Sequence, residues 1–120
     1  MQKIGVIIVC LVAAWLGTAA PAAAAIAVLQ GLDKVTARIS TIEAPIGQPV
    51  HFGTLIITAR TCQKKPPEET PESAAFLEID DQKPGEPAER IFTGWMFASS
   101  PALNALQHPV YDVWVKDCKP

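Results

Sequence analysis

The stretch Phe52-Gly-Thr-Leu-Ile-Ile-Thr-Ala-Arg-Thr-Cys62 decides the fold. Leu55, Ile57 and Ala59 alternate with polar residues, which is the two-residue period of a half-buried β-strand. Side chains of the β-branched type, which favour strands, recur along it. The stretch therefore predicts a strand that ends at a cysteine.

Similar alternation on both sides of this stretch predicts the other strands. These predicted strands cover residues 35–40, 75–80, 90–97 and 110–117. Connectors rich in proline, glycine and charge separate them, and residues 26–34 are interpreted as a short lead-in segment. About five short strands predict an all-β fold, either a small antiparallel barrel or a two-layer sandwich.

A short helix is expected between the last two strands. Ser99 or Ser100 could cap it, and Pro101 suits a first helical position. Leu103 and Leu106 would share one face. His108 precedes a proline and is therefore pushed towards extended geometry, which would end the helix.

The N-terminal segment has the three regions of a secretory signal peptide. Lys3 is followed by an apolar run over residues 4–17 and by small residues up to Ala25. A retained anchor would need about 20 apolar residues. We expect residues 1–25 to be a cleaved signal peptide and residues 26–120 to form one secreted β domain, periplasmic or secreted, without membrane insertion after cleavage.

Cleavage would also decide the cysteine chemistry. It removes Cys10 and leaves Cys62 and Cys118 in an oxidising compartment, where a disulfide is the default expectation. The closed loop would contribute about 4 kcal/mol in the chain-entropy relation. His51 and His108 lack the spacing that would recruit these cysteines into a zinc site, so we expect no metal and no cofactor.

Size, charge and motifs argue against several functional classes. Residues 26–120 carry a formal charge of −3, so they lack the basic footprint of a nucleic-acid-binding protein. Ser99 or Ser100, His108 and Asp112 follow the order of some nucleophilic triads, but no G-x-S-x-G motif is present. The adjacent Asp80 and Asp81 are interpreted as turn residues. We therefore expect no enzymatic activity.

Aromatic residues gather near the C-terminus. In the last predicted strand, Trp114 shares the polar face with Asp112 and Lys116, whereas Tyr111 shares the opposite face with two valines. Trp95 belongs to the preceding strand. If the two strands pair, Trp114 is the aromatic residue expected to be partly exposed. The candidate binding patch consists of Trp114, Trp95, Asp112 and Lys116. The alternative is that both tryptophans are core residues.

Three sequence segments carry a family resemblance. They are Gly31-Leu-Asp-Lys34, Arg60-Thr-Cys62 and Gly94-Trp-Met-Phe-Ala-Ser-Ser-Pro-Ala-Leu-Asn-Ala-Leu-Gln-His-Pro-Val-Tyr-Asp-Val-Trp-Val-Lys-Asp-Cys118. Together they resemble the domain of unknown function 2155 family, and the resemblance covers nearly all of residues 26–120. It implies a small secreted alphaproteobacterial protein with no assigned activity, and it transfers no catalytic residue.

These observations favour a role in binding. The leading hypothesis is an exported envelope protein that acts as an interaction or accessory protein for an envelope protein partner. The alternative is a carbohydrate-binding module that recognises a wall or exported polysaccharide through Trp114 and Trp95.

Overall fold

The computed structural model describes residues 25–120, so the predicted signal peptide lies outside the described part except for Ala25. Within this part the chain forms seven strands and no helix. They are β1 (Ile26–Asp33), β2 (Arg38–Pro45), β3 (Pro49–Phe52), β4 (Leu55–Lys64), β5 (Ser73–Asp81), β6 (Glu89–Phe97) and β7 (Tyr111–Lys119). The all-β prediction is confirmed.

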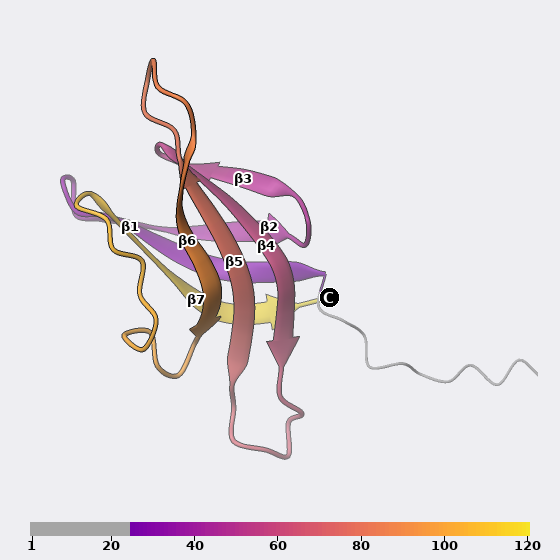
Figure 1. Ribbon diagram of the computed structural model, residues 1–120. Helices are drawn as coiled ribbons and strands as arrows, with labels where there is room; N and C mark the ends of the chain where they lie inside the picture. The colour runs from indigo at the N-terminus through magenta and orange to yellow at the C-terminus, as the bar shows by residue number, and fades with distance from the viewer. Residues whose placement is uncertain (1–24) are drawn as a thin grey trace, which may run out of the picture.

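The strands form two antiparallel sheets that pack against each other. One has the order β2-β1-β7 and the other the order β3-β4-β5-β6, and their strands cross in the view of Figure 1. The barrel is not closed, so the layered alternative describes the fold. The core lies between the sheets, and its largest fully buried side chains are Leu29, Leu55, Ile57, Leu77, Ile79 and Val115.

The first hairpin differs from its prediction. The lead-in segment is strand β1, and the next strand begins at Arg38 because the Asp33 carboxylate accepts the backbone N–H groups of Val35 and Thr36 and holds a turn. Ala37 lies within this turn at a φ of 59°. The alternation of Val35, Ala37 and Ile39 with polar residues predicted a half-buried strand over residues 35–40. That prediction is wrong, because all three are exposed, Val35 by 78% and Ile39 by 58%.

The predicted helix before the last strand is absent from the described residues. A single turn forms, in which the Leu103 N–H donates to the Ser100 carbonyl at 3.0 Å. Ser99 gives both its N–H and its hydroxyl to Glu72, so its hydroxyl is not available as a helix cap. Leu103 is 74% exposed whereas Leu106 is 4% exposed and packs in the core, so the two leucines do not share one face as the prediction required.

Two β-bulges bring the cysteines to the core. In β4 the register passes from Ala59 to Thr61, and in β7 from Val115 to Asp117, so Arg60 and Lys116 are extra residues. Each extra residue shifts the inward and outward alternation by one position. Cys62 and Cys118 consequently face inward and form a disulfide between the two sheets, which confirms the predicted bond.

Candidate functional site

The outer face of the three-stranded sheet carries most of the predicted patch. Val113 and Val115 are buried against the other sheet, so the alternation turns Trp114 outward, where its side chain is half-buried. Trp114 lies opposite Gln30 of β1, and Gln30 in turn lies opposite Thr41 of β2. The indole thus belongs to a continuous row across the solvent-facing side of this sheet.

Charged residues border this row. The Asp112 carboxylate lies 3.2 Å from the Lys34 ammonium group, which also donates a hydrogen bond of 2.8 Å to the His108 carbonyl. At the other end of the face, Lys119 and Glu43 form an ion pair. Lys116 is exposed at its bulge. The face therefore offers one aromatic surface between groups of both charge signs.

Trp95 lies elsewhere. Strand β6 belongs to the four-stranded sheet and β7 to the other sheet, so these strands do not pair and Trp95 is separated from the other three residues of the predicted patch. The Trp95 ring meets the Phe76 ring edge-on, with centroids 5.6 Å apart, on the outer face of the four-stranded sheet. Trp95 and Trp114 therefore point to opposite sides of the sandwich.

A buried polar cluster, which we call the histidine cluster, consists of Thr54, Asp81 and His108. His108 Nε2 lies 2.9 Å from Asp81 Oδ2, and the Thr54 hydroxyl donates to Asp81 Oδ1 at 2.6 Å. His108 Nδ1 accepts the backbone N–H groups of Val110 and Tyr111 at 3.0 and 3.1 Å. In the neutral ring the proton must therefore reside on Nε2 and be donated to Asp81.

The surroundings of Asp81 favour the ionised form of its carboxyl group. Burial alone raises the pKa of a carboxyl group, but the hydrogen bonds from Thr54 and His108 outweigh this effect and hold the pKa of Asp81 below its usual range. The side chains of His108 and Asp81 are 8% and 6% exposed. Gly53 sits beside the cluster at a φ of 60°, and an added Cβ would lie 2.2 Å from the Tyr111 hydroxyl oxygen.

The arrangement does not form a nucleophilic triad. His108 pairs with Asp81, Asp112 pairs with Lys34, and Ser99 bonds to Glu72, so the three sequence candidates have separate partners. In the histidine cluster the carboxylate lies between the hydroxyl and the imidazole, whereas hydroxyl activation needs the imidazole in the middle. The cluster is suited to holding chain segments together.

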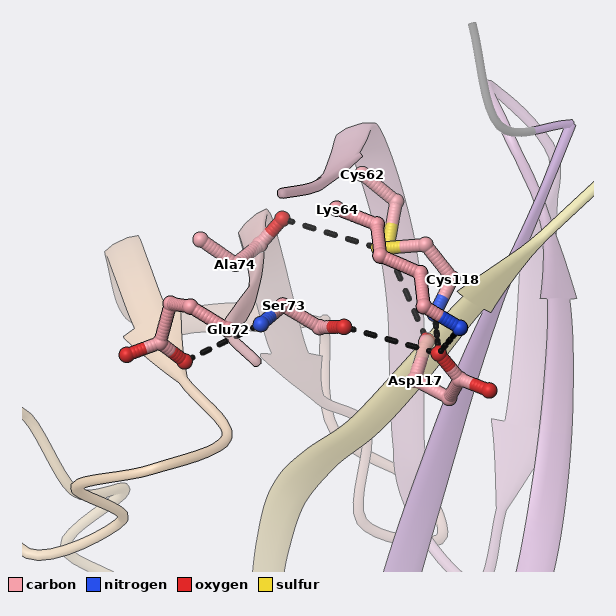
Figure 2. The surroundings of a disulfide bond; sticks show 7 residues. All are labelled: Cys62, Lys64, Glu72, Ser73, Ala74, Asp117 and Cys118. Atoms are coloured by element: carbon pink, nitrogen blue, oxygen red, sulfur yellow. Dashed lines mark hydrogen bonds and ion pairs between the residues drawn. A yellow bond between two sulfur atoms is a disulfide. The ribbon is translucent and has the colours of Figure 1, made fainter. Parts of the chain in front are cut away.

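A second group of polar residues surrounds the disulfide (Figure 2). Lys64 Nζ lies 2.9 Å from Asp117 Oδ1, which also accepts the Cys118 N–H at 2.8 Å. The bond from Lys64 is the main reason why the pKa of Asp117 lies below its usual range. Lys64 and Asp117 line a cleft of 520 Å³ together with residues of the β4–β5 loop. Figure 2 also shows the buried Ser73 between Glu72 and Asp117.

The described residues contain neither a cluster of metal ligands nor a membrane-spanning helix. Over residues 25–120, no group of three or more His, Cys, Asp or Glu side chains gathers as a metal-ligand set. The same range holds no helix of the length and apolar character needed to cross a membrane.

The role of Asp81 was not predicted. Asp80 and Asp81 are adjacent at the end of β5, and a turn role was the natural interpretation. Asp81 faces inward, pairs with Leu55 across the sheet and is 6% exposed. Asp81 continues the two-residue alternation of the buried Leu77 and Ile79. Only this alternation could have indicated that Asp81 is buried.

The fold and its outer faces define a small all-β sandwich with one disulfide between its sheets and partly exposed tryptophans. The chain belongs to the family described as "Uncharacterized protein conserved in bacteria (DUF2155)", whose family model matches residues 27–118. It is 31% identical over 87 residues to an uncharacterized protein of Rickettsia prowazekii (strain Madrid E). That match covers 72% of this chain and 56% of the relative, so the chain spans about half of the relative's length. No solved structure matches the chain.

Proposed function

We propose that this protein is exported to the cell envelope and acts there by binding a protein partner, as an interaction or accessory protein without catalytic activity. The observation that carries the proposal is the half-buried Trp114 on the outer face of the three-stranded sheet. Large aromatic side chains that keep contact with water serve as anchors in protein interfaces. The neighbouring Asp112 and Lys34 would supply the polar rim.

The test compares two aromatic residues of β7. Trp114→Ala should abolish capture of the partner from envelope extract and leave the thermal melt nearly unchanged. Tyr111→Ala is the matched control, because Tyr111 packs on the core and against Phe52, with ring centroids 5.3 Å apart. It should lower stability, since a large core aromatic costs about 3–5 kcal/mol when truncated. A Trp114→Ala protein that melts as early as Tyr111→Ala would contradict the proposal.

Export rests on the signal-like N-terminus, and it has its own test. A protein released from the envelope should begin near Ile26 when its intact mass is measured. The oxidised protein should show no thiol that reacts under denaturing conditions, because Cys62 and Cys118 are bonded. A membrane-bound species that retains Met1 would contradict cleavage.

A glycan is the second candidate ligand, and Trp95 favours it. Trp95, Phe76 and Phe97 lie together on the outer face of the four-stranded sheet, where all three are half-buried. Flat aromatic groups of this kind can stack on sugar rings. Retention on insoluble wall glycan that is lost in Trp95→Ala and kept in Trp114→Ala would favour this candidate over the protein partner.

A further inference from the structure

The outward edge of β2 has backbone N–H and C=O groups that point away from its sheet. Across the β1–β2 pair, the Ile46 N–H donates to the Ala25 carbonyl at 2.9 Å. Counting by twos along the register, Ala44, Ile42 and Ser40 also direct their backbone groups to β1. The alternate residues Ile39, Thr41 and Glu43 therefore direct their N–H and C=O groups away from the sheet.

No hydrogen bond of the described residues uses these outward groups. The other three sheet edges differ. Strand β3 has only four residues and begins with a proline. On β6, the Asn104 side chain donates to the Trp95 carbonyl at 2.7 Å. On β7, the Asp117 carboxylate occupies the Cys118 N–H. Proteins shorten or cover edges in such ways to prevent pairing with other chains. On β2, which ends at Pro45, no such cover reaches the outward groups of Ile39, Thr41 and Glu43.

The side chains at this edge are apolar and cationic. Ile39 is 58% exposed and lies on the same outer face as Thr41, and Val35 in the adjoining turn is 78% exposed. Arg38 is exposed at the start of β2 and makes no ion pair with any described residue. Glu43 at the other end is already paired with Lys119.

Charge and parity argue against a second copy of this chain as the occupant. Two copies joined antiparallel in one continuous sheet must place residues of equal parity opposite each other, because both side chains project to the same face. Arg38 and Glu43 differ in parity and cannot face each other. The register centred on Thr41 would place Ile39 against Glu43, an apolar side chain against a carboxylate.

We propose that the β2 edge binds an extended segment of a partner protein by strand addition. The segment places an apolar side chain beside Ile39 and an acidic side chain beside Arg38. Its backbone pairs with the N–H and C=O groups of Ile39, Thr41 and Glu43. The inference rests on the proposed function, since it specifies how a protein partner is held, and it places that partner beside the Trp114 row.

The test uses random peptides long enough to span β2, displayed and selected on the purified, oxidised protein. Selected peptides should alternate apolar and polar residues with an acidic end, and should slow hydrogen exchange at Ile39, Thr41 and Glu43. Thr41→Pro removes one outward N–H and leaves the β1 ladder intact, as prolines at sheet edges do. Peptide binding should weaken roughly tenfold or more. The matched control Thr41→Val keeps the N–H and should bind normally.

The outcomes separate this inference from the proposed function. Equal binding to Thr41→Pro and wild type, protection at other strands, or peptides without alternation would overturn strand addition. Peptide binding that is lost in Trp114→Ala and kept in Thr41→Pro would overturn it and leave the proposed function standing. If Thr41→Pro does not fold, N-methylation of alternate peptide residues tests the same backbone pairing from the side of the peptide, because it removes the peptide's N–H donors. Normal binding of the methylated peptide would then refute the inference, as would concentration-dependent dimers that bind no peptide.

Discussion

At one end of the sandwich a disulfide joins the two sheets, and at the other end the histidine cluster joins them through hydrogen bonds. Cys62 lies after the bulge of β4 and meets Cys118 of β7. At the far ends of the same sheets, Asp81 of β5 meets His108, whose carbonyl accepts from Lys34 after β1. The first tie survives any change of protonation, whereas the second depends on a charged carboxylate. The two ends therefore predict different responses to mutation and to acid.

The largest expected effect concerns the bulge that serves the disulfide end. Deleting Thr58 should disrupt β4 in either of two ways: a retained bulge turns Ala59 outward and Cys62 away from Cys118, and a lost bulge turns the Arg60 side chain towards the core. Deleting Arg60 should leave regular alternation, because Arg60 is the extra residue of the bulge. Mass spectrometry under non-reducing conditions should find the disulfide in the Arg60 deletion, and urea titration should find that protein more stable than the Thr58 deletion. A missing disulfide in both proteins would show that the bulge itself is required.

The same bulges explain how far the sequence could predict this fold. Strand alternation predicted β4, β5, β6 and β7 to within a few residues, and compartment chemistry predicted the disulfide. Uninterrupted alternation after Ala59 and Val115, however, predicts that both cysteines lie on the outer faces. The extra residue of each bulge leaves no signal in the alternation pattern. β1 was missed because Val28 and Leu32 are apolar on its outward face and hide the period.

The candidate site was predicted in part for a related reason. Alternation within β7 placed Trp114 outward next to Asp112, and this depends only on local geometry. Which residues neighbour Trp114 depends on which strands pair. The alternation pattern does not indicate that β6 and β7 belong to different sheets. The contact between Asp81 and His108 joins residues 27 positions apart with β6 between them, and His108 lies in a segment without regular structure, so no periodic signal could reveal it.

Removal of the disulfide should have the next largest effect. The double variant Cys62→Ser with Cys118→Ser opens a loop whose ends are 56 positions apart, and should lose about 4 kcal/mol of the free energy of unfolding. Urea titration of the oxidised wild type and the variant gives the difference. Hydrogen exchange should quicken most around residues 62, 74 and 118. Uniform acceleration that includes residues 108–111 would mean that the two ends do not act separately.

Removal of the buried carboxylate tests the opposite end. Asp81→Ala leaves the Nε2–H of His108 and the Thr54 hydroxyl without their acceptor, and an unsatisfied buried polar group costs about 1–3 kcal/mol. Amides of residues 54 and 108–111 should exchange faster, while those beside Cys118 stay protected. Asp80→Ala is the matched control, because Asp80 lies on the outer face with Arg90. A larger loss for Asp80→Ala would refute the role of the cluster.

Acid should distinguish the ends without mutation. Because the pKa of Asp81 is lowered in the folded protein, its stabilising effect is complete above the unfolded value of about 3.9 and is lost as the pH falls through the folded value. Asp117 follows the same sign, but the disulfide still holds its surroundings. Below about pH 4, exchange should therefore rise first at residues 108–111. Asp81→Asn should flatten this dependence, and an unchanged profile in that variant would assign the effect to other carboxylates.

The smallest expected difference comes from two lysines that each meet an aspartate of β7. Lys34 lies 3.2 Å from Asp112, and Lys64 lies 2.9 Å from Asp117. Both pairs are partly exposed, so each should contribute about 0–1 kcal/mol and weaken as salt is added. Lys34 also donates to the His108 carbonyl, whereas Lys64 lies beside a covalent bond that already fixes its partner. Lys34→Met should therefore lower the melting temperature more than Lys64→Met, and the gap should narrow in Asp81→Ala, where His108 is already released. A larger effect for Lys64→Met, at low and at high salt, would mean that the disulfide end depends on its ion pair as well as on its covalent bond.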